Sequence, residues 1–296
     1  MSDFSSLHVP VLAREVIDWL DPQPGQTIVD ATLGGGGHTA ELAARVGGQG
    51  MIVALDRDPA ALSAAQSKLA GRPVEMVMAN FCDLPEVLAQ LNIEQVDGVL
   101  MDLGISSDQL ADQERGFSFN ARGTLDLRFN PAEGEPAWRL VHRLKERELA
   151  DLIYQNGEER YSRRIAKKIV TQRRQQPIRT AAELAELIRR CVPGGVRHGR
   201  IHPATRTFQA LRIAVNQELS SLETALQRIP DILRPGGRVA VISFHSLEDR
   251  PAKMAFRDDP RYEVLTKKPI RPTPEEVQRN PRSRSARLRV ARRALE

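Results

Sequence analysis

The feature that most constrains the fold of this chain is the alternation of short, apolar, β-branched stretches with helical ones. Five stretches predict strands, at residues 27–31, 51–56, 74–79, 96–102 and 238–244. Between the first four, apolar residues recur at intervals of three and four, which predicts helices at residues 39–46, 59–70 and 84–91. Strands that alternate with helices pair as a parallel sheet, so an α/β fold is expected.

A long segment separates the fourth and fifth predicted strands. Residues 103–237 lie there, although a crossover between parallel strands needs only about a dozen residues. Residues 104–136, rich in Gly, Asp, Asn and Phe, predict a long ordered loop, and helical spacing follows at residues 138–154, 160–173 and 181–191. We therefore expect a helical domain, residues 107–203, inserted between two parts of the α/β domain, residues 1–106 and 204–296.

The second part of the α/β domain has its own expected elements. A helix over residues 205–226 leads into the fifth strand. After that strand, residues 262–265 and 286–290 are expected to form an antiparallel pair of basic C-terminal strands, joined by a Pro-rich link at residues 269–281.

The charge of the chain favours a polyanionic partner. The formal net charge is +5 and the pI about 9.5. Basic residues cluster at 160–174 and again at 279–293, whereas residues 21–100 are balanced. A solvated helix face is the alternative interpretation of the first cluster.

Other classes of protein are disfavoured by what the sequence lacks. No apolar run approaches the ~18 residues of a membrane span, and no signal peptide is recognisable, so a cytoplasmic protein without a membrane partner is expected. Cys82 and Cys191 are far apart and have no CxxC or Cys/His spacing. We therefore expect neither a disulfide nor a metal site.

A glycine-rich loop marks the expected ligand site. Residues 28–39, IVDATLGGGGHT, run from a predicted strand through glycines into a predicted helix, whose N-terminus offers unpaired N–H groups. The dinucleotide fingerprint G-x-G-x-x-G fails, because Thr39 stands where its third glycine should be. The pattern D-x-x-x-G-x-G is met by Asp30, Gly34 and Gly36, and its carboxylate suits a cationic amino-acid group. This favours S-adenosylmethionine bound in a Rossmann-like domain.

Three more polar or aromatic side chains stand where predicted strands end. Asp56 comes 22 residues after Gly34, close to the spacing of an acid that accepts hydrogen bonds from ribose hydroxyls; an exposed turn aspartate is the alternative. Phe81 is placed to pack on adenine, with ordinary core packing as the alternative. Asp102 directs a carboxylate into the crevice at the carboxyl ends of the strands, where open α/β sheets bind ligands.

With these residues in view, the chain closely resembles the bacterial small-subunit ribosomal RNA cytosine-N4 methyltransferases, the RsmH or MraW family. The likeness covers nearly the whole chain. Eight matching blocks occur in order, at residues 8–12, 34–38, 56–59, 102–107, 115–119, 202–213, 242–250 and 280–286.

This resemblance implies a class I S-adenosylmethionine-dependent methyltransferase that modifies N4 of a cytidine in the decoding, P-site region of 16S ribosomal RNA. It implies an assembled small (30S) subunit as partner and leaves a homodimer open. The cofactor contacts that it implies are Gly36, Gly37, His38, Asp56, Phe81, Asp102 and Gln109. Of these, His38 and Gln109 rest on the resemblance alone.

The sequence departs from the family pattern at two places. Residues 125–129 read LDLRF where LDMRM is more usual, a swap of similar volume. Pro251 stands where the family tends to have Val or Ile, and it limits backbone hydrogen bonding next to residues 246–250.

Methyl transfer from a sulfonium needs alignment of the nucleophile and an acceptor for the N4 proton, not a covalent intermediate. Asp102 is the expected acceptor, with the carbonyls of residues 103–106 as the alternative. The aromatic motif that amino-methyltransferases carry at this point is replaced by Asp-Leu-Gly-Ile, so the ring that stacks on the base is expected from Phe117, Phe119 or Phe244; core packing is the alternative for each.

Three competing functions remain open at this stage. His245, Ser246 and Glu248 invite a hydrolase interpretation, although neighbouring residues seldom form a triad and no G-x-S-x-G elbow is present. A ribosome assembly factor would bind RNA tightly whether or not the cofactor is present. A nicotinamide oxidoreductase would change nicotinamide fluorescence.

Overall fold

The computed structural model describes residues 10–193 and 202–295, so His8 and Val9 of the first family block lie outside the described residues. The described residues form two compact units. The first combines those of 1–106 with those of 219–296, and the second consists of those of 107–218.

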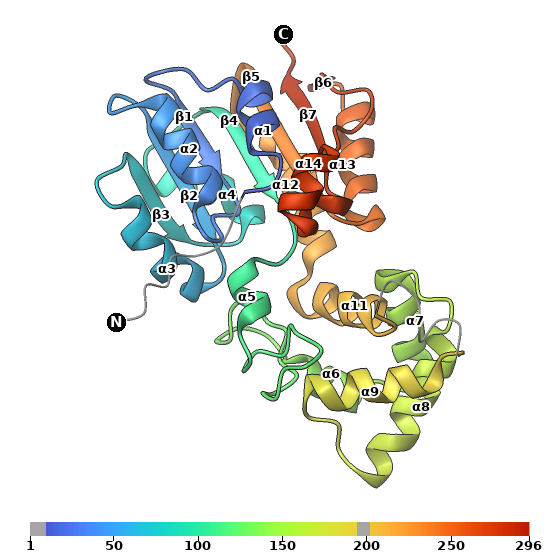
Figure 1. Cartoon of the computed structure of the whole chain (residues 1–296). Helices are drawn as coiled ribbons and strands as arrows, with labels where there is room; N and C mark the ends of the chain where they lie inside the picture. The colour runs from blue at the N-terminus through green and yellow to red at the C-terminus, as the bar shows by residue number, and fades with distance from the viewer. Residues whose placement is uncertain (1–9, 194–201, 296) are drawn as a thin grey trace. The chain divides into compact units, whose positions relative to one another are not determined.

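A seven-stranded sheet forms the centre of the first unit, in the order β3-β2-β1-β4-β5-β7-β6 (Figure 1). Neighbouring strands from β3 to β5 pair parallel, and β7 is antiparallel to both β5 and β6. The strands are β1 (Thr27–Asp30), β2 (Met51–Asp56), β3 (Val74–Met78), β4 (Val96–Asp102), β5 (Leu233–Ser243), β6 (Tyr262–Val264) and β7 (Arg287–Arg293). The predicted parallel sheet and the predicted antiparallel C-terminal pair are both present.

The strand boundaries agree with the sequence except at β5. The bounds predicted for β2 and β4 are those observed, and β1 and β3 end one residue early. β5 begins at Leu233 rather than at Arg238, because Leu233 already pairs with Val96 before the register shifts between Val96 and Gly98. The Pro-Gly-Gly segment at residues 235–237 hid this early pairing from a periodicity argument.

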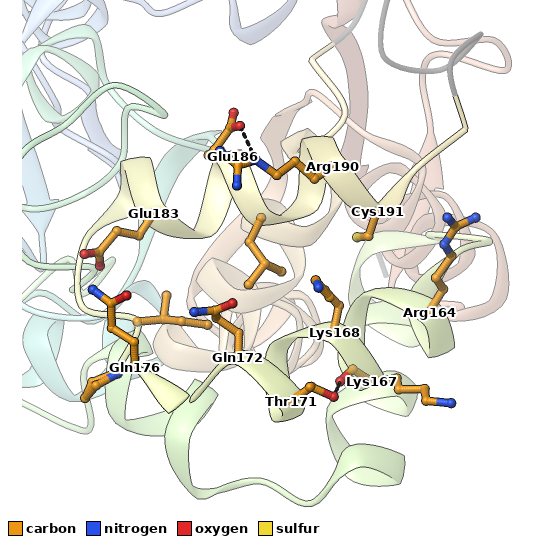
Figure 2. Close-up of a pocket in the computed structure, with 13 residues that line it drawn as sticks. Arg164, Lys167, Lys168, Thr171, Gln172, Gln176, Glu183, Glu186, Arg190 and Cys191 are labelled. Atoms are coloured by element: carbon orange, nitrogen blue, oxygen red, sulfur yellow. Dashed lines mark hydrogen bonds and ion pairs between the residues drawn. The ribbon is translucent and has the colours of Figure 1, made fainter. Parts of the chain in front are cut away.

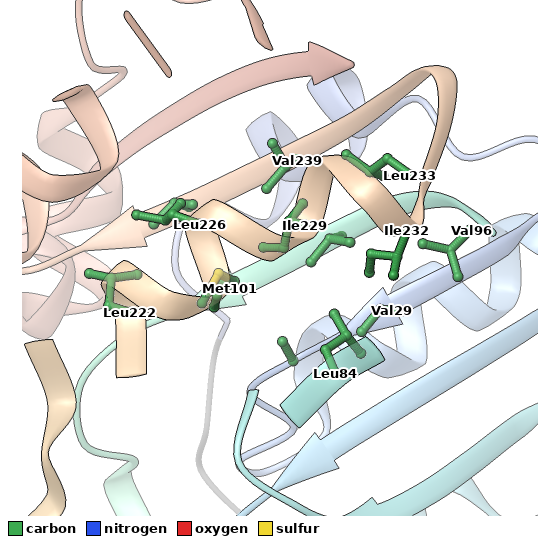
Figure 3. Packing of buried hydrophobic residues seen from close by; sticks show 14 of the residues in the cluster. Val29, Leu84, Val96, Met101, Leu222, Leu226, Ile229, Ile232, Leu233 and Val239 are labelled. Atoms are coloured by element: carbon green, nitrogen blue, oxygen red, sulfur yellow. The ribbon is translucent and has the colours of Figure 1, made fainter. Parts of the chain in front are cut away.

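Helices cover both faces of the sheet, and consecutive strand residues face opposite layers. On one face the buried residues come from α1 (Ala13–Leu20), α2 (Gly37–Val46) and α3 (Pro59–Leu69). On the other face they come from α4 (Leu84–Gln90), α12 (Glu218–Ile232) and α13 (Ser246–Asp258). Figure 3 shows Met101 and Val239 of the sheet beside the α12 residues Leu222, Leu226 and Ile229, and Val29 beside Leu84 of α4.

Several short elements of the first unit were not anticipated. They are α1, α13, α14 (Pro274–Arg279) and the 3-10 turns η1 (Phe81–Asp83) and η2 (Pro281–Ser285). Pro251 lies inside α13, beyond the first turn, where it cannot donate a backbone hydrogen bond to the carbonyl of Leu247 in the preceding turn. The helix continues through it to Asp258.

The second unit contains α5 (Ser107–Ala111), α6 (Ala137–Arg143), α7 (Glu146–Gly157), α8 (Ser162–Gln175), α9 (Ala181–Cys191) and α11 (Thr205–Asn216). The helix expected at residues 138–154 is two helices, because Leu144 and Lys145 adopt extended conformations. The helix expected at residues 205–226 is also two, α11 and α12, separated by Gln217 at φ 53°. Helical spacing continues across both breaks, so periodicity alone could not reveal them.

The second unit extends further than predicted. Its last residue is Glu218, not Pro203. The reason is that α11 packs on α7: Arg206 donates to the carbonyl of Glu158, Gln209 donates to that of Asn156, and a side chain at Gly157 would collide with the backbone of Arg206.

The long loop of the second unit is tied down by backbone hydrogen bonds. Leu125 donates to Arg179 and Trp138 donates to Leu125, while Thr124 bridges Thr180. Among the described residues of the whole chain, no helix is long and apolar enough to cross a membrane.

Candidate functional site

The carboxyl ends of β1 and β4 adjoin at the point where the strand order reverses. β1 lies between β2 and β4, and the next helices of the first unit after β1 and β4, α2 and α12, pack on opposite faces of the sheet. Such a reversal opens a crevice above the strand ends. Asp30, Asp56 and Asp102, which end β1, β2 and β4, therefore stand along one edge of the sheet.

The glycine loop turns sharply between β1 and α2. Gly34 (φ 48°) and Gly36 (φ 68°) adopt left-handed conformations that favour glycine, and Gly36 is the N-cap residue of α2. A Cβ on Gly36 would touch Ala65 and Leu69 at 3.4 Å. Gly37 and His38 open α2, so their backbone N–H groups belong to the first, unpaired turn of the helix.

Asp30 plays a different part from the one expected. Its side chain is fully buried and accepts hydrogen bonds from the Thr39 hydroxyl at 2.6 Å and from the Thr32 N–H at 3.2 Å. Burial raises the pKa of this carboxyl despite these bonds. Asp30 therefore fastens the glycine loop to α2, and the expectation that it faces a ligand is wrong.

Asp56 also supports the loop, from the end of β2. One carboxylate oxygen accepts from the Gly34 N–H at 2.9 Å and the other from the Asp58 N–H at 2.9 Å. Burial raises its pKa to about 6, against the lowering effect of these bonds. The Asp56 side chain is half-buried at the edge of the crevice. Each carboxylate oxygen has a second lone pair that can accept a hydrogen bond from a ligand hydroxyl.

Asp102 is held close to His38. Its Oδ2 lies 3.7 Å from Nε2 of His38, whose exposed fraction is only 6%. Oδ1 of Asp102 is buried and has no hydrogen-bond partner among the described residues. Burial, together with the charges of Asp30 and Glu248, raises the pKa of Asp102 well above its usual range, while Arg282 opposes the shift. A buried acceptor that lacks a donor is the kind of group that a ligand satisfies.

Two residues that the sequence analysis did not assign to the site support Asp102. Arg282 of η2 donates to the carbonyls of Ile105 at 3.0 Å and Ser106 at 3.3 Å, just beyond β4. Glu248, 3% exposed, accepts from the Phe244 N–H at 2.8 Å and caps α13. Both residues lie within family blocks, 280–286 and 242–250, so a signal was available for each, but nothing in the local sequence marked Glu248 as buried.

The His245, Ser246 and Glu248 group is a helix cap. One carboxylate oxygen of Glu248 accepts hydrogen bonds from the backbone N–H groups of Phe244 and His245. Its other oxygen lies 3.0 Å from Nε2 of the His245 ring. Such a geometry positions the start of α13 after β5. It gives no support to a hydrolase.

The candidate aromatic residues separate into two groups. Phe117 stacks on Phe129 and Phe119 on His202, all within the second unit. Phe81, half-buried after β3, packs against the core cluster of the first unit. Phe244 follows β5, and a Cβ on Gly104 would meet its ring at 3.4 Å. Gln109 lies in α5 of the second unit and is 7% exposed.

The crevice of the first unit fits an S-adenosylmethionine-like ligand. The orphaned Oδ1 of Asp102 suits a cationic or hydrogen-bond-donating group, Asp56 suits hydroxyls, and the glycine loop lets a ligand approach the backbone. No cluster of three or more His, Cys, Asp or Glu side chains that could hold a metal occurs among the described residues.

Comparisons with known proteins give a consistent result. A family model described as the MraW methylase family matches residues 5–294. A protein of Rhodopirellula baltica named ribosomal RNA small subunit methyltransferase H is 52% identical, and the match covers 97% of this chain and 91% of the relative. A protein of the same name from Synechococcus elongatus is 50% identical, with 97% and 95% covered.

A solved structure of a protein described as a putative rRNA-methylase from Clostridium thermocellum is also similar to the chain. Its TM-score is 0.48 at 12% identity, with 97% of this chain and all of that chain covered. The fold assignment rests on the strand order and on the family match.

Proposed function

The chain belongs to the MraW methylase family, and from that premise we propose that it methylates N4 of a cytidine in the decoding, P-site region of 16S ribosomal RNA. It is an S-adenosylmethionine-dependent methyltransferase. The observation that carries the proposal is the match to relatives named ribosomal RNA small subunit methyltransferase H, at about half of all positions over nearly the full length of both chains. We also propose the cytoplasm as its location, which is consistent with a substrate in the small ribosomal subunit.

Within the first unit, the proposed cofactor site consists of Gly36, Gly37, His38, Asp56, Phe81 and Asp102. Gln109 stays a cofactor contact that the family resemblance alone implies. When bound, S-adenosylmethionine supplies an electrophilic methyl group on a positively charged sulfur. Asp56 accepts hydrogen bonds from the ribose hydroxyls, and Gly36 and Gly37 leave room beside the helix N-terminus. Burial of these groups excludes water and strengthens their electrostatic effect.

Asp102 is the group that we assign to the N4 proton. S-adenosylmethionine bound here would supply the methyl group, and the carboxylate of Asp102 would take the proton that N4 of the cytosine loses when it is methylated. Oδ1 of Asp102 is free to accept it, whereas Arg282 already engages the carbonyls of Ile105 and Ser106. Among the alternative acceptors, this favours Asp102 over those two carbonyls.

The base must also be held beside the cofactor. Phe244 is the aromatic residue that we favour, because it adjoins Gly104 two residues after Asp102 in the same unit. Phe117 and Phe119 already stack on other rings. A base recognised in this way has to be single-stranded or extruded.

The test is direct. The protein is incubated with S-adenosylmethionine and small subunits that lack the modification, and N4-methylcytidine is quantified after digestion, resolved from its 5-methyl isomer. Cofactor-dependent formation of that nucleoside is expected. Cofactor binding without the product would refute the proposed substrate, and tight RNA binding indifferent to the cofactor would point to an assembly factor.

A further inference from the structure

A cleft of about 680 Å³ lies in the second unit, between α8 and α9. This volume falls in the range of about 300–1,000 Å³ that is typical of ligand sites. Figure 2 shows Lys168, Gln172 and Gln176 between the two helices, with Arg164 near Cys191 at one end. All of the lining residues belong to this one unit, and none is placed in the proposed catalytic site.

All of the charged residues in α8, the helix that forms one wall of the cleft, are basic. This helix, SRRIAKKIVTQRRQ, carries six basic residues and no acidic one. Arg163 and Lys167, and likewise Arg164 and Lys168, are like charges four residues apart, an arrangement that destabilises a helix. A helix selected only for solubility would carry both acidic and basic residues. The absence of acidic residues from α8 therefore indicates that this helix binds a polyanion.

The acids on the opposite wall do not neutralise these cations. Glu183 accepts the N–H groups of Arg179 and Thr180 at the start of α9. Glu186 is engaged by Arg189 at 2.7 Å and Arg190 at 2.6 Å, and their proximity lowers its pKa to about 2. Among the described residues, the exposed cations Arg164, Lys167 and Lys168 have no carboxylate within ion-pair distance.

The remaining lining residues indicate which part of a polyanion the cleft takes. Thr171, Gln172 and Gln176 supply neutral hydrogen-bonding groups, and the floor contains Ile178 and Leu187. No lining residue is aromatic. Base recognition in single-stranded RNA relies on stacking against aromatic rings, whereas phosphates need only cations and hydrogen-bond donors.

We propose that the cleft between α8 and α9 binds the sugar–phosphate backbone of the ribosomal RNA substrate and does not select bases. The proposal rests on the proposed function, which makes RNA the polyanion that this protein meets. The cleft binds an RNA segment whatever its base sequence. It therefore contributes to the affinity for RNA and does not determine which cytidine is methylated.

The test compares three variants. The cleft variant combines Arg164→Gln, Lys167→Gln and Lys168→Gln. The control variant replaces three exposed lysines of the first unit, as Lys253→Gln, Lys267→Gln and Lys268→Gln. The charge-retaining variant combines Lys167→Arg and Lys168→Arg. Circular dichroism checks that each folds. Fluorescence anisotropy then measures Kd for two single-stranded RNA oligonucleotides of unrelated sequence between 50 and 200 mM salt.

The cleft variant is expected to bind both RNAs more weakly and to lose about 2 from the slope of log Kd against log salt, at about 0.7 per phosphate contact. Over a fourfold range of salt, the affinity of the wild type should therefore fall about 15-fold more than that of the variant. The control and charge-retaining variants should behave as the wild type. An unchanged slope in the cleft variant, or an equal loss in the control variant, would overturn the proposal.

Two further readouts separate this proposal from the one that it rests on. With small subunits as substrate, the cleft variant should show a raised KM and unchanged affinity for S-adenosylmethionine. If the wild type forms no N4-methylcytidine while RNA binding still depends on the cleft, the proposed function fails and the backbone site stands. If the variant binds stripped ribosomal RNA normally but intact subunits poorly, the cleft contacts a protein and the RNA proposal is wrong.

Discussion

At the scale of single residues, three strand-end aspartates of similar sequence context have three different environments. Asp30 is fully buried and accepts a hydrogen bond from the Thr39 hydroxyl, and Asp56 accepts one from the Gly34 N–H of the glycine loop. Oδ1 of Asp102 has no hydrogen-bond partner among the described residues. Only the last two remain available to a ligand. All three side chains lie on the same face of the sheet, because Asp30 pairs with Ala54 and Leu100, and Asp56 and Asp102 each lie two residues beyond these partners. The distinction follows instead from the hydrogen-bond donors around each carboxylate.

The pKa of about 6 for Asp56 predicts a pH dependence of cofactor binding. Above pH 6 the ionised carboxylate accepts ribose hydroxyls strongly, and below pH 6 protonation weakens those bonds by about 1 kcal/mol. The affinity for S-adenosylhomocysteine, which carries no charge on sulfur, should therefore fall about fivefold from pH 7 to pH 5, as measured by calorimetry. Asp56→Asn should bind weakly and flatten the profile; a variant profile as steep as that of the wild type would exclude Asp56.

The buried carboxylate of Asp102 predicts a preference for a charged sulfur. Asp102→Asn keeps the shape of the side chain but removes its charge, so it should lose affinity for S-adenosylmethionine more than for S-adenosylhomocysteine and reduce turnover by about 10²–10⁴-fold. Asp97→Asn, at the opposite end of β4, is the matched control, because that carboxylate serves Thr27 and Arg234 instead. An unchanged ratio of the two Kd values with near-normal turnover would remove Asp102 from the mechanism.

At the scale of elements, the turn into α2 depends on left-handed backbone at Gly36. Gly36→Ala should cost about 1–2 kcal/mol of stability and also weaken cofactor binding, because the strained turn carries the helix N-terminus. Gly71→Ala is the control, since Gly71 has φ 73° and no atom within 4 Å of its added Cβ. Both should lower Tm, measured by thermal unfolding. Equal losses of cofactor affinity in the two variants would show that the effect is only strain.

The break between α11 and α12 is bridged by an ion pair. Arg212 and Glu218 meet through two bonds of 2.8 Å, and their side chains are 12% and 11% exposed. Removing either partner alone, as in Arg212→Met or Glu218→Gln, should cost about 3 kcal/mol in urea unfolding, and the double variant should cost less than the sum. The exposed pair Arg143 and Glu135 provides a contrast whose loss should leave the free energy of unfolding almost unchanged. Strict additivity at Arg212 and Glu218 would contradict the coupling.

At the scale of the whole molecule, the two units have separate cores. S-adenosylmethionine at 100 times its Kd should stabilise the unit that binds it by about 2.7 kcal/mol. Hydrogen exchange should therefore slow in β1 and β4 and much less in α8 and α9. A uniform increase in protection would show that the units unfold together.

The sequence alone determined much of this protein, because the relevant signals are local. Alternating strand and helix patterns predicted the parallel sheet, and long matching blocks indicated the family. Parallel pairing follows from the alternation of strands and helices, so it can be inferred without knowing any contact between distant residues.

Only the tertiary structure decided the rest. Three features depend on contacts that the local sequence does not show. Both oxygens of Asp30 are hydrogen-bonded, whereas Oδ1 of Asp102 has no partner among the described residues. Arg282 donates to the carbonyl of Ile105, and α11 packs on α7. The helix breaks at Leu144 and Gln217 are likewise invisible to periodicity, because the apolar pattern continues through them. Burial and hydrogen bonding are properties of the packed molecule, and it is these that set which carboxylates can act.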